Sequence, residues 1–238
     1  MPEITIDTSG AGSRELRGYL ARPAGDGPFP GVVVVHEAFG LTDEMRGQAD
    51  RLARAGYLAV VPDLFSDGGA ARCLLGTFRA LFAGRGKAID DIDAARDHLR
   101  TQAECTGRVG IIGFCMGGGF ALVTANRGFD VAAPNYGKLP ADAEQALSGA
   151  CPIVASYGGK DVSLRGSAAK LEQTLDGLGI AHDVEEYPSA GHSFLNDRYF
   201  GPAPTHALQR IAHVGPDPQA APDAWRRIEA FFARYLQG

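Results

Sequence analysis

A cysteine between two glycines is the residue of this sequence best suited to do chemistry. The segment Gly113-Phe114-Cys115-Met116-Gly117 follows the apolar run 109–112 and precedes residues 120–123, which have helical spacing. A G-x-nucleophile-x-G sequence between a strand and a helix is typical of a nucleophile elbow, where glycines permit a sharp turn and expose the nucleophile. The start of the helix also favours a thiolate and, later, an oxyanion. We therefore predict that Cys115 is a nucleophile.

The simpler alternative is a structural cysteine, because free cysteines are among the most buried residue types. Here the predicted strand, the glycines and the predicted helix agree with each other. Two suitable partners for the thiol also occur later in the chain. This agreement favours the catalytic interpretation.

Asp161 and His192 are those two partners. A nucleophilic thiol needs a base and a group that orients the base, and in α/β-hydrolases they follow in the order nucleophile, acid, histidine. Asp161 comes after the predicted strand 153–157, and His192 lies in a loop after the predicted strand 183–187, where Gly191 gives the backbone freedom to present the imidazole. Alone, Asp161 would more often be a helix N-cap, and a lone loop histidine is usually solvated. The chain order of Cys115, Asp161 and His192 therefore predicts a catalytic triad.

A second short segment, residues 36–40, follows the predicted strand 32–35 at the place where an oxyanion-hole N–H normally arises. We predict that the backbone N–H groups of Ala38 and Met116 form this hole. Glu37 is unusual there, because a carboxylate would repel the developing charge unless it is protonated or paired with an arginine. An exposed loop acid is an equally good interpretation of Glu37.

Alternating and continuous apolar runs predict the elements that position these residues. Residues 4–6 and 16–20 alternate like antiparallel edge strands, whereas several later runs have the β-branched composition of strands buried on both faces. These buried runs are 32–35, 57–61, 109–112, 131–133 and 153–157, with helical segments such as 45–55 between most of them. A strand at 183–187, a Pro-rich stretch at 201–222 and a last helix around Trp225 follow. The sequence predicts a single α/β domain over residues 1–238, with a doubly wound, mainly parallel sheet and an N-terminal antiparallel hairpin.

Composition excludes several classes of function. The 238 residues are 45% hydrophobic and 21% charged, and the net charge of −5 offers no basic surface for nucleic acid. We find no signal peptide and no run long enough to span a membrane, so we expect a cytoplasmic protein that is a monomer or a small homo-oligomer. The four cysteines lie far apart and lack zinc-binding spacing, which predicts reduced thiols and no metal site.

Five segments together resemble the motifs of the dienelactone hydrolase family of α/β-hydrolases. They are residues 36–40, 62–65, 113–118, 159–161 and 191–194, and they cover about the first five sixths of the chain. The resemblance implies that Cys115 is the nucleophile, His192 the base, Asp161 its orienting acid and Glu37 a partner of the thiol in the resting state. In that family, binding of a substrate carboxylate to an arginine is thought to release the glutamate, which then helps to deprotonate the cysteine.

The arginines are where this sequence departs from the family. One family arginine corresponds to Asn196, with Arg198 two residues further on, and Arg72 is the nearest match to the other. Arg72 and Arg79 are seven residues apart, so they share one face of a helix whose other face carries Leu74, Leu75, Phe78 and Phe82. We predict that Arg72 binds a substrate carboxylate with help from Arg198, and a solvated basic face is an equal alternative.

Thiolate chemistry limits the substrates. A thiolate attacks carbonyl groups well but also leaves well, so esters with poor leaving groups should react slowly. Enol lactones, aryl esters and thioesters have better leaving groups. We therefore predict a cofactor-free hydrolase of activated esters and enol lactones that acts through a thioacyl-enzyme. The alternatives are a broader carboxylesterase or thioesterase, and a noncatalytic binding protein whose thiol senses oxidants.

Overall fold

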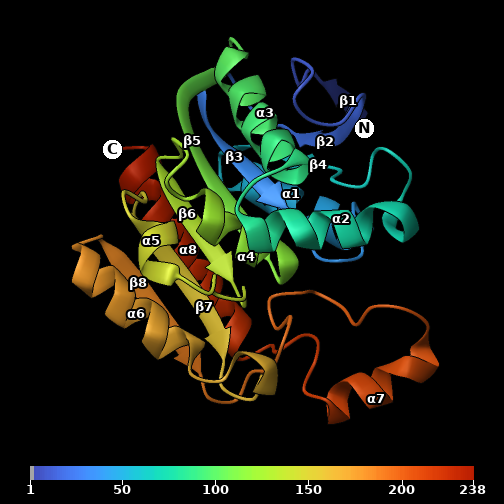
Figure 1. The fold of residues 1–238 in the computed structure, drawn as a ribbon, viewed down its shortest axis with the longest axis vertical. Helices are drawn as coiled ribbons and strands as arrows, with labels where there is room; N and C mark the ends of the chain where they lie inside the picture. The colour runs from blue at the N-terminus through green and yellow to red at the C-terminus, as the bar shows by residue number, and fades with distance from the viewer. Residues whose placement is uncertain (1–2) are drawn as a thin grey trace.

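One eight-stranded sheet forms the centre of the computed structural model, which describes residues 3–238 (Figure 1). The strand order is β1-β2-β4-β3-β5-β6-β7-β8, with antiparallel pairing of β1 with β2 and of β2 with β4, and parallel pairing elsewhere. The strands are β1 (Glu3–Ile6), β2 (Leu16–Ala21), β3 (Phe29–Val35), β4 (Leu58–Pro62), β5 (Cys105–Phe114), β6 (Val131–Asn135), β7 (Ile153–Gly158) and β8 (His182–Tyr187). The predicted α/β fold with its N-terminal hairpin is confirmed.

Helices cover both faces of the sheet, as the apolar composition of its parallel strands requires. Helices α3 (Lys87–Thr101), α4 (Met116–Thr124) and α6 (Ser167–Leu178) lie in front of the sheet in Figure 1, and α8 (Ala220–Leu236) lies behind it. Helix α1 (Asp43–Arg54) packs beside α8, since the guanidinium of Arg51 lies 4.5 Å from the ring centroid of Trp225. The shorter or peripheral elements are α2 (Ala70–Ala83), α5 (Ala143–Leu147), α7 (His206–Ile211) and the 3₁₀ turns η1 (Val162–Leu164) and η2 (Ala203–Thr205).

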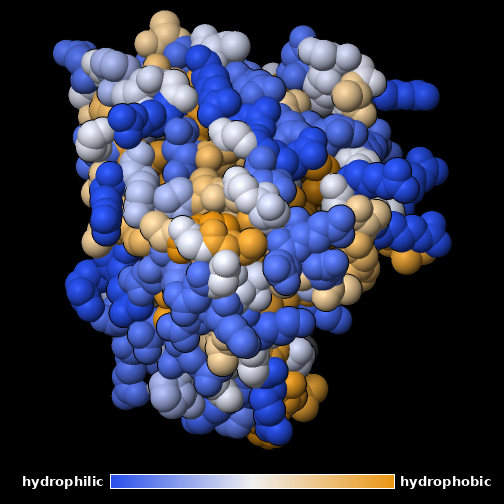
Figure 2. Space-filling view, turned by 60° about the vertical axis from the view of Figure 1, so that its left-hand side comes forward, coloured by the Kyte–Doolittle hydropathy of each residue, from blue (hydrophilic) through white to orange (hydrophobic). Residues whose placement is uncertain are grey.

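Burial follows the sequence pattern. Every residue from Val32 to Val35 is fully buried, because β3 lies in the middle of the sheet with helices on both sides. On the face of the molecule that Figure 2 shows, hydrophilic residues predominate and hydrophobic residues form small patches. No helix of residues 3–238 is long and apolar enough to cross a membrane.

The Pro-rich stretch contains structure that the sequence did not predict. It carries η2 and α7, which extend away from the sheet at the lower right of Figure 1. After α7 the chain returns to the loop that carries His192. The N–H of His192 donates to the carbonyl of His213 at 2.8 Å, and the N–H of Gly215 donates to the carbonyl of His192 at 2.8 Å. This extension is therefore anchored on the backbone of a predicted site residue.

Candidate active site

The predicted sharp turn from a strand to a helix is present at Cys115, between β5 and α4. Cys115 has φ 54° and ψ −113°, a conformation that is strained for a residue with a side chain. The glycines are required by close packing of the backbone. A Cβ atom on Gly117 would lie 2.0 Å from the carbonyl oxygen of Val35, and one on Gly113 would lie 1.9 Å from the carbonyl oxygen of Gly117. The elbow is thus pressed against the end of β3, and the cysteine is held above the strand ends.

The neighbouring strand fixes the elbow from its other side. The N–H of Cys115 donates to the carbonyl of Asn135 at 3.1 Å, and the Nδ2 of Asn135 donates to the carbonyl of Gly113 at 3.3 Å. Asn135 is fully buried at the end of β6. These bonds satisfy backbone groups that the sharp turn would otherwise leave unpaired.

The structure brings Asp161 and His192 together as predicted. The Nδ1 of His192 lies 2.5 Å from Oδ2 of Asp161, and the imidazole lines the same pocket as Cys115. Asp161 also caps η1, because its Oδ1 accepts from the N–H and the hydroxyl of Ser163 at 3.0 and 2.6 Å. The capping and orienting roles considered from the sequence therefore belong to the same carboxylate.

Charges in this group favour an ion pair. Burial by itself would lower the pKa of His192, but the hydrogen bonds and charges of Asp161 and Cys115 raise it to about 10. Burial by itself would raise the pKa of Asp161, but the hydrogen bonds from His192 and Ser163 lower it below the ordinary value. The ion pair is therefore the one between the imidazolium of His192 and the carboxylate of Asp161.

Gly191 is required for a reason that differs from the predicted one. The sequence suggested backbone freedom, whereas a Cβ atom at this position would lie 1.8 Å from the carbonyl oxygen of His213. The residue with the unusual backbone is Ser193, which has φ 58°. Close approach of the returning chain, rather than conformational freedom, therefore explains this glycine.

Glu37 is buried rather than an exposed loop acid, with 6% of its surface accessible. The hydroxyl of Ser193 donates to its Oε1 at 2.9 Å, and the Nδ2 of Asn196 lies 3.3 and 3.2 Å from its two oxygens. Burial raises the pKa of Glu37, and these hydrogen bonds together with the charge of His192 oppose the rise. Asn196, at the position of a family arginine, is thus a neutral partner of Glu37. Residues 3–238 contain no hydrogen bond between Glu37 and Cys115, so the predicted partnership of these two groups stays a prediction.

Tyr136 links this buried group to the pocket. Its hydroxyl donates to Oδ1 of Asn196 at 3.4 Å, and its ring lies 5.3 Å from the ring of His192. Burial, with the charges of Glu37 and Cys115, holds its pKa well above the ordinary value. The sequence offered one signal for Tyr136, its position three residues after the predicted strand 131–133.

The two predicted oxyanion-hole residues occupy suitable elements. Met116 is the first residue of α4, so its N–H has no acceptor one turn earlier in the helix, and Ala38 follows the end of β3. His36, the first residue of the segment 36–40, is completely buried and accepts from the N–H of Leu64 at 3.1 Å through Nε2. Its Nδ1 lies 2.6 Å from the carbonyl of Glu37, and burial lowers the pKa of His36. A neutral His36 therefore holds the loop that carries Ala38.

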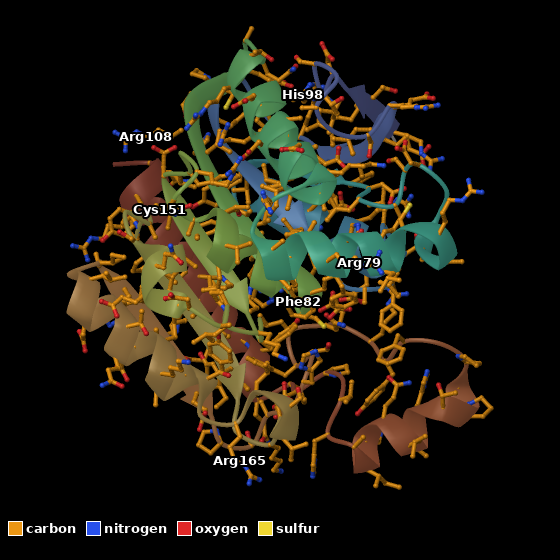
Figure 3. All side chains as sticks on the ribbon, in the orientation of Figure 1. Arg79, Phe82, His98, Arg108, Cys151 and Arg165 are labelled. Atoms are coloured by element: carbon orange, nitrogen blue, oxygen red, sulfur yellow. The ribbon has the colours of Figure 1, made fainter. Side chains whose placement is uncertain are left out.

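A pocket of about 280 Å³ opens beside the cysteine. It is lined by Phe78, Leu81, Phe82, Cys115, Met116, Tyr136, Lys138, Ser163, Leu164 and His192. Figure 3 shows Phe82 at the lower edge of α2, toward the carboxyl end of the sheet. The walls are mainly apolar with a few polar side chains among them, which is typical of a small-molecule site.

Neither predicted arginine lines this pocket. Arg72 is exposed and borders a separate hollow with Asp67 and Lys87. The Arg198 side chain is 73% exposed, and its Nε lies 3.7 Å from a carboxylate oxygen of Glu44. The structure therefore does not bring either arginine to the site where we predicted that it binds a substrate carboxylate.

The other three cysteines lie away from the elbow. Cys73 borders the hollow of Arg72, and Cys151 precedes β7 at the opposite end of the sheet from Phe82, as Figure 3 shows. Burial raises the pKa of Cys151 to about 12. Cys105 is the first residue of β5. All four cysteines are free, and residues 3–238 contain no group of three or more His, Cys, Asp or Glu side chains that could hold a metal ion.

The sheet order, the nucleophile elbow and the acid–histidine pair define a protein of the α/β-hydrolase class. Residues 16–236 match the dienelactone hydrolase family, so the chain belongs to that family and is a hydrolase of ester or lactone bonds. The chain is similar to a carboxymethylenebutenolidase of Rhodococcus opacus, with 31% identity over 92% of this chain and 86% of that protein.

Solved structures show the same similarity. A dienelactone hydrolase-like promiscuous phosphotriesterase from metagenomic libraries is 25% identical, with a TM-score of 0.80 and coverage of 99% of this chain and 98% of the other. A dienelactone hydrolase of Anabaena variabilis shares the fold at 22% identity, with a TM-score of 0.70 and coverage of 99% and 97%.

Proposed function

We propose that the protein hydrolyses activated esters and enol lactones through a thioacyl-enzyme formed on Cys115. The observation that carries this proposal is the Asp161–His192 pair whose imidazole lines the same small, mainly apolar pocket as Cys115. A thiol acting as a sensor in a binding protein would not need an oriented base beside it.

Each step has a residue suited to it. The thiolate of Cys115 attacks the carbonyl carbon, so that an S–C bond forms and the C=O π electrons move to the oxygen. The N–H groups of Ala38 and Met116 stabilise this oxyanion. When the oxyanion collapses, the bond to the leaving oxygen breaks, and the imidazolium of His192 gives its proton to that oxygen.

Deacylation reverses these roles. His192 takes a proton from water while the water oxygen attacks the thioester carbon, and the S–C bond then breaks to return the thiolate. An enol released from a lactone in the first half-reaction tautomerises to a ketone, which makes lactone opening hard to reverse. Asp161 keeps the imidazole in one orientation throughout both halves.

The predicted substrate range can be tested with a graded panel. We expect kcat/KM to fall in the order aryl ester or enol lactone, thioester, alkyl ester, amide, because a thiolate is expelled when the competing leaving group is poor. Equal rates for aryl and alkyl esters would contradict the proposal, and so would turnover that persists after alkylation of Cys115. A broad response to aryl esters and thioesters without lactone opening would favour the carboxylesterase or thioesterase alternative.

A further inference from the structure

We propose that α2 and residues 198–214, which we call the arm, together form a surface that docks on anionic lipid membranes. The arm carries η2 and α7 and follows the loop of His192 in the chain. Docking there brings the mouth of the Cys115 pocket, which α2 borders, to the lipid surface. This inference concerns the outside of the molecule and goes beyond the proposed function.

The exposed large hydrophobic side chains of residues 3–238 are unevenly distributed. None of them lies on α1, α3, α6 or α8, and most lie on α2 and the arm. Leu75 and Phe82 of α2 are 63% and 67% exposed, and Leu208 and Ile211 of α7 are 68% and 76% exposed. The whole set is Phe39, Leu75, Phe82, Val162, Phe200, Leu208 and Ile211. Exposed apolar side chains that gather in this way are typical of an interaction surface.

Contacts connect the arm to α2. The rings of Phe39 and Phe200 lie 4.7 Å apart, so the loop after β3 touches the arm. Phe39 also borders a hollow together with Ala70, the first residue of α2. The other end of α2 reaches the Cys115 pocket through Phe82. Figure 1 shows α7 below α2 on the same side of the molecule. The two apolar groups therefore belong to one surface.

The same segments carry cations and no acids, although the chain as a whole has a net charge of −5. Residues 68–89 and the arm contain neither Asp nor Glu. Arg79 and Arg210 are exposed, and the ion pairs formed within residues 3–238 include neither of them. The full set of cations is Arg72, Arg79, Arg85 and Lys87 around α2, and Arg198 and Arg210 in the arm. A basic surface on an acidic protein is attracted to a negatively charged partner.

The arrangement of these side chains favours a lipid surface over other anionic partners. The exposed side of α2 presents Leu75, Arg79 and Phe82 in succession, at spacings of four and three residues. Apolar and aromatic side chains beside arginines are typical of helices that lie in the membrane interface, where the arginines reach lipid phosphates and the rings enter the acyl boundary. A second copy of this surface, placed against the first, would set cations opposite cations.

Co-sedimentation with vesicles tests the inference directly. The full-length protein is mixed with vesicles of equal parts phosphatidylcholine and phosphatidylglycerol, or of phosphatidylcholine alone. We expect binding to the anionic vesicles, little binding to the neutral ones, and weaker binding at high salt because the charges are screened. Arg79→Gln combined with Arg210→Gln should weaken binding by roughly 10- to 30-fold.

A matched pair of substitutions controls for the change in net charge. Arg54→Gln combined with Lys170→Gln removes two exposed cations of α1 and α6, and this variant should bind like the wild type. An equal loss in the two double variants would show that binding depends only on net charge. That result would overturn the proposed surface.

The apolar contribution is measured at constant charge. Leu208→Ser combined with Ile211→Ser should weaken binding by at least about tenfold, because two exposed side chains no longer enter the lipid. The midpoint of urea denaturation should hardly change. In Leu75→Trp, the new tryptophan should be quenched by brominated lipid, whereas Trp225, which is 2% exposed, should be quenched little in the wild type. An unquenched Leu75→Trp on bound vesicles would contradict docking through α2.

Two other occupants would give different results. If the surface binds an acidic protein, soluble polyglutamate should displace the vesicles and the serine substitutions should have no effect. If it binds a second copy, light scattering should show a dimer that Leu208→Ser with Ile211→Ser converts to a monomer, and vesicles should not be bound. Either result would overturn the lipid proposal. Ester hydrolysis enters none of these measurements, so failure of the proposed function and failure of this inference are distinguishable.

Discussion

Two hollows of about 280 Å³ lie along α2, and they differ in what the sheet contributes to them. The hollow of Arg72 contains two cations and a carboxylate, and Lys87 is paired with Asp67. The pocket of Cys115 contains fewer charges, but it receives residues from the ends of β5, β6 and β7 and from the loop after β8. The two hollows therefore differ more in the strand ends that supply their lining than in their number of charged side chains.

The difference between the hollows comes from the edge of the sheet. In a parallel sheet the carboxyl ends of neighbouring strands meet, so residues distant in sequence converge there. The elbow adds the half-buried thiol of Cys115 and the N-terminus of α4 at the same place. The hollow of Arg72 has Cys73 as its own thiol but no imidazole among its lining residues.

The largest effect should come from removing the thiol. Cys115→Ala takes away the attacking atom and only a small side chain, so ester hydrolysis should fall by roughly 10⁴-fold or more while the fold is retained. Cys73→Ala is the matched control from the other hollow and should keep wild-type turnover. Steady-state rates with an aryl ester measure both, and comparable losses in the two variants would remove the distinction between the hollows.

The next largest effect should come from Asp161→Asn. Loss of the hydrogen bond and charge of Asp161 should lower the pKa of His192 from about 10 toward the ordinary value of about 6.5 and reduce kcat by roughly 100-fold or more. An NMR titration of the His192 ring reports the pKa separately from the rate. An unchanged titration would mean that Asp161 does not set the charge of His192.

The same pair should make stability depend on pH. The pKa of His192 is raised in the folded protein, so the stabilisation from its protonated form is complete below about pH 6.5 and is lost as the pH rises through about 10. The free energy of unfolding, measured by urea denaturation across this range, should therefore fall with pH more steeply in the wild type than in Asp161→Asn. Parallel curves would contradict this prediction.

A smaller effect, on stability, should follow from His36→Phe. The substitution keeps a ring of similar shape but leaves the N–H of Leu64 and the carbonyl of Glu37 without their present partner. Each unsatisfied buried group costs about 1–3 kcal/mol, so the midpoint of urea denaturation should fall. If His36 only fills space, the midpoint should hardly change.

The smallest effect should come from Arg72→Ala. Because Arg72 is exposed and lies in the other hollow, kcat/KM should change less than about twofold for both anionic and neutral esters. A selective loss on the anionic ester would show that Arg72 reaches the Cys115 pocket during turnover, and the separation of the two hollows would then not hold in solution.

Sequence and structure agree best where a residue follows a buried strand. The elbow around Cys115 and the positions of Asp161 and His192 could be predicted because glycine spacing, strand ends and chain order all constrain them. The helix that carries Arg72 was also predicted, but the side of this helix that faces the pocket of Cys115 was not. Arg72 and Phe78 are six residues apart, which places them about 120° apart around the helix, and spacing does not show which side faces the nucleophile.

Other parts of the site carry no local signal. The hydrogen bonds of Glu37 come from Ser193 and Asn196, more than 150 residues away in sequence. Helix α7 is short and lies in a Pro-rich stretch, where periodicity cannot be recognised. Contacts over such distances depend on the tertiary fold and not on local pattern.

The most direct test of the central claim is to trap the thioacyl-enzyme. The wild-type protein is mixed with an aryl ester, quenched in acid within the first turnovers, and examined by intact mass spectrometry and peptide mapping. The account predicts an acyl adduct on the peptide that contains Cys115, labile to hydroxylamine and absent from Cys115→Ala. Turnover in the wild type with no adduct on Cys115, or with the adduct on another residue, would contradict it.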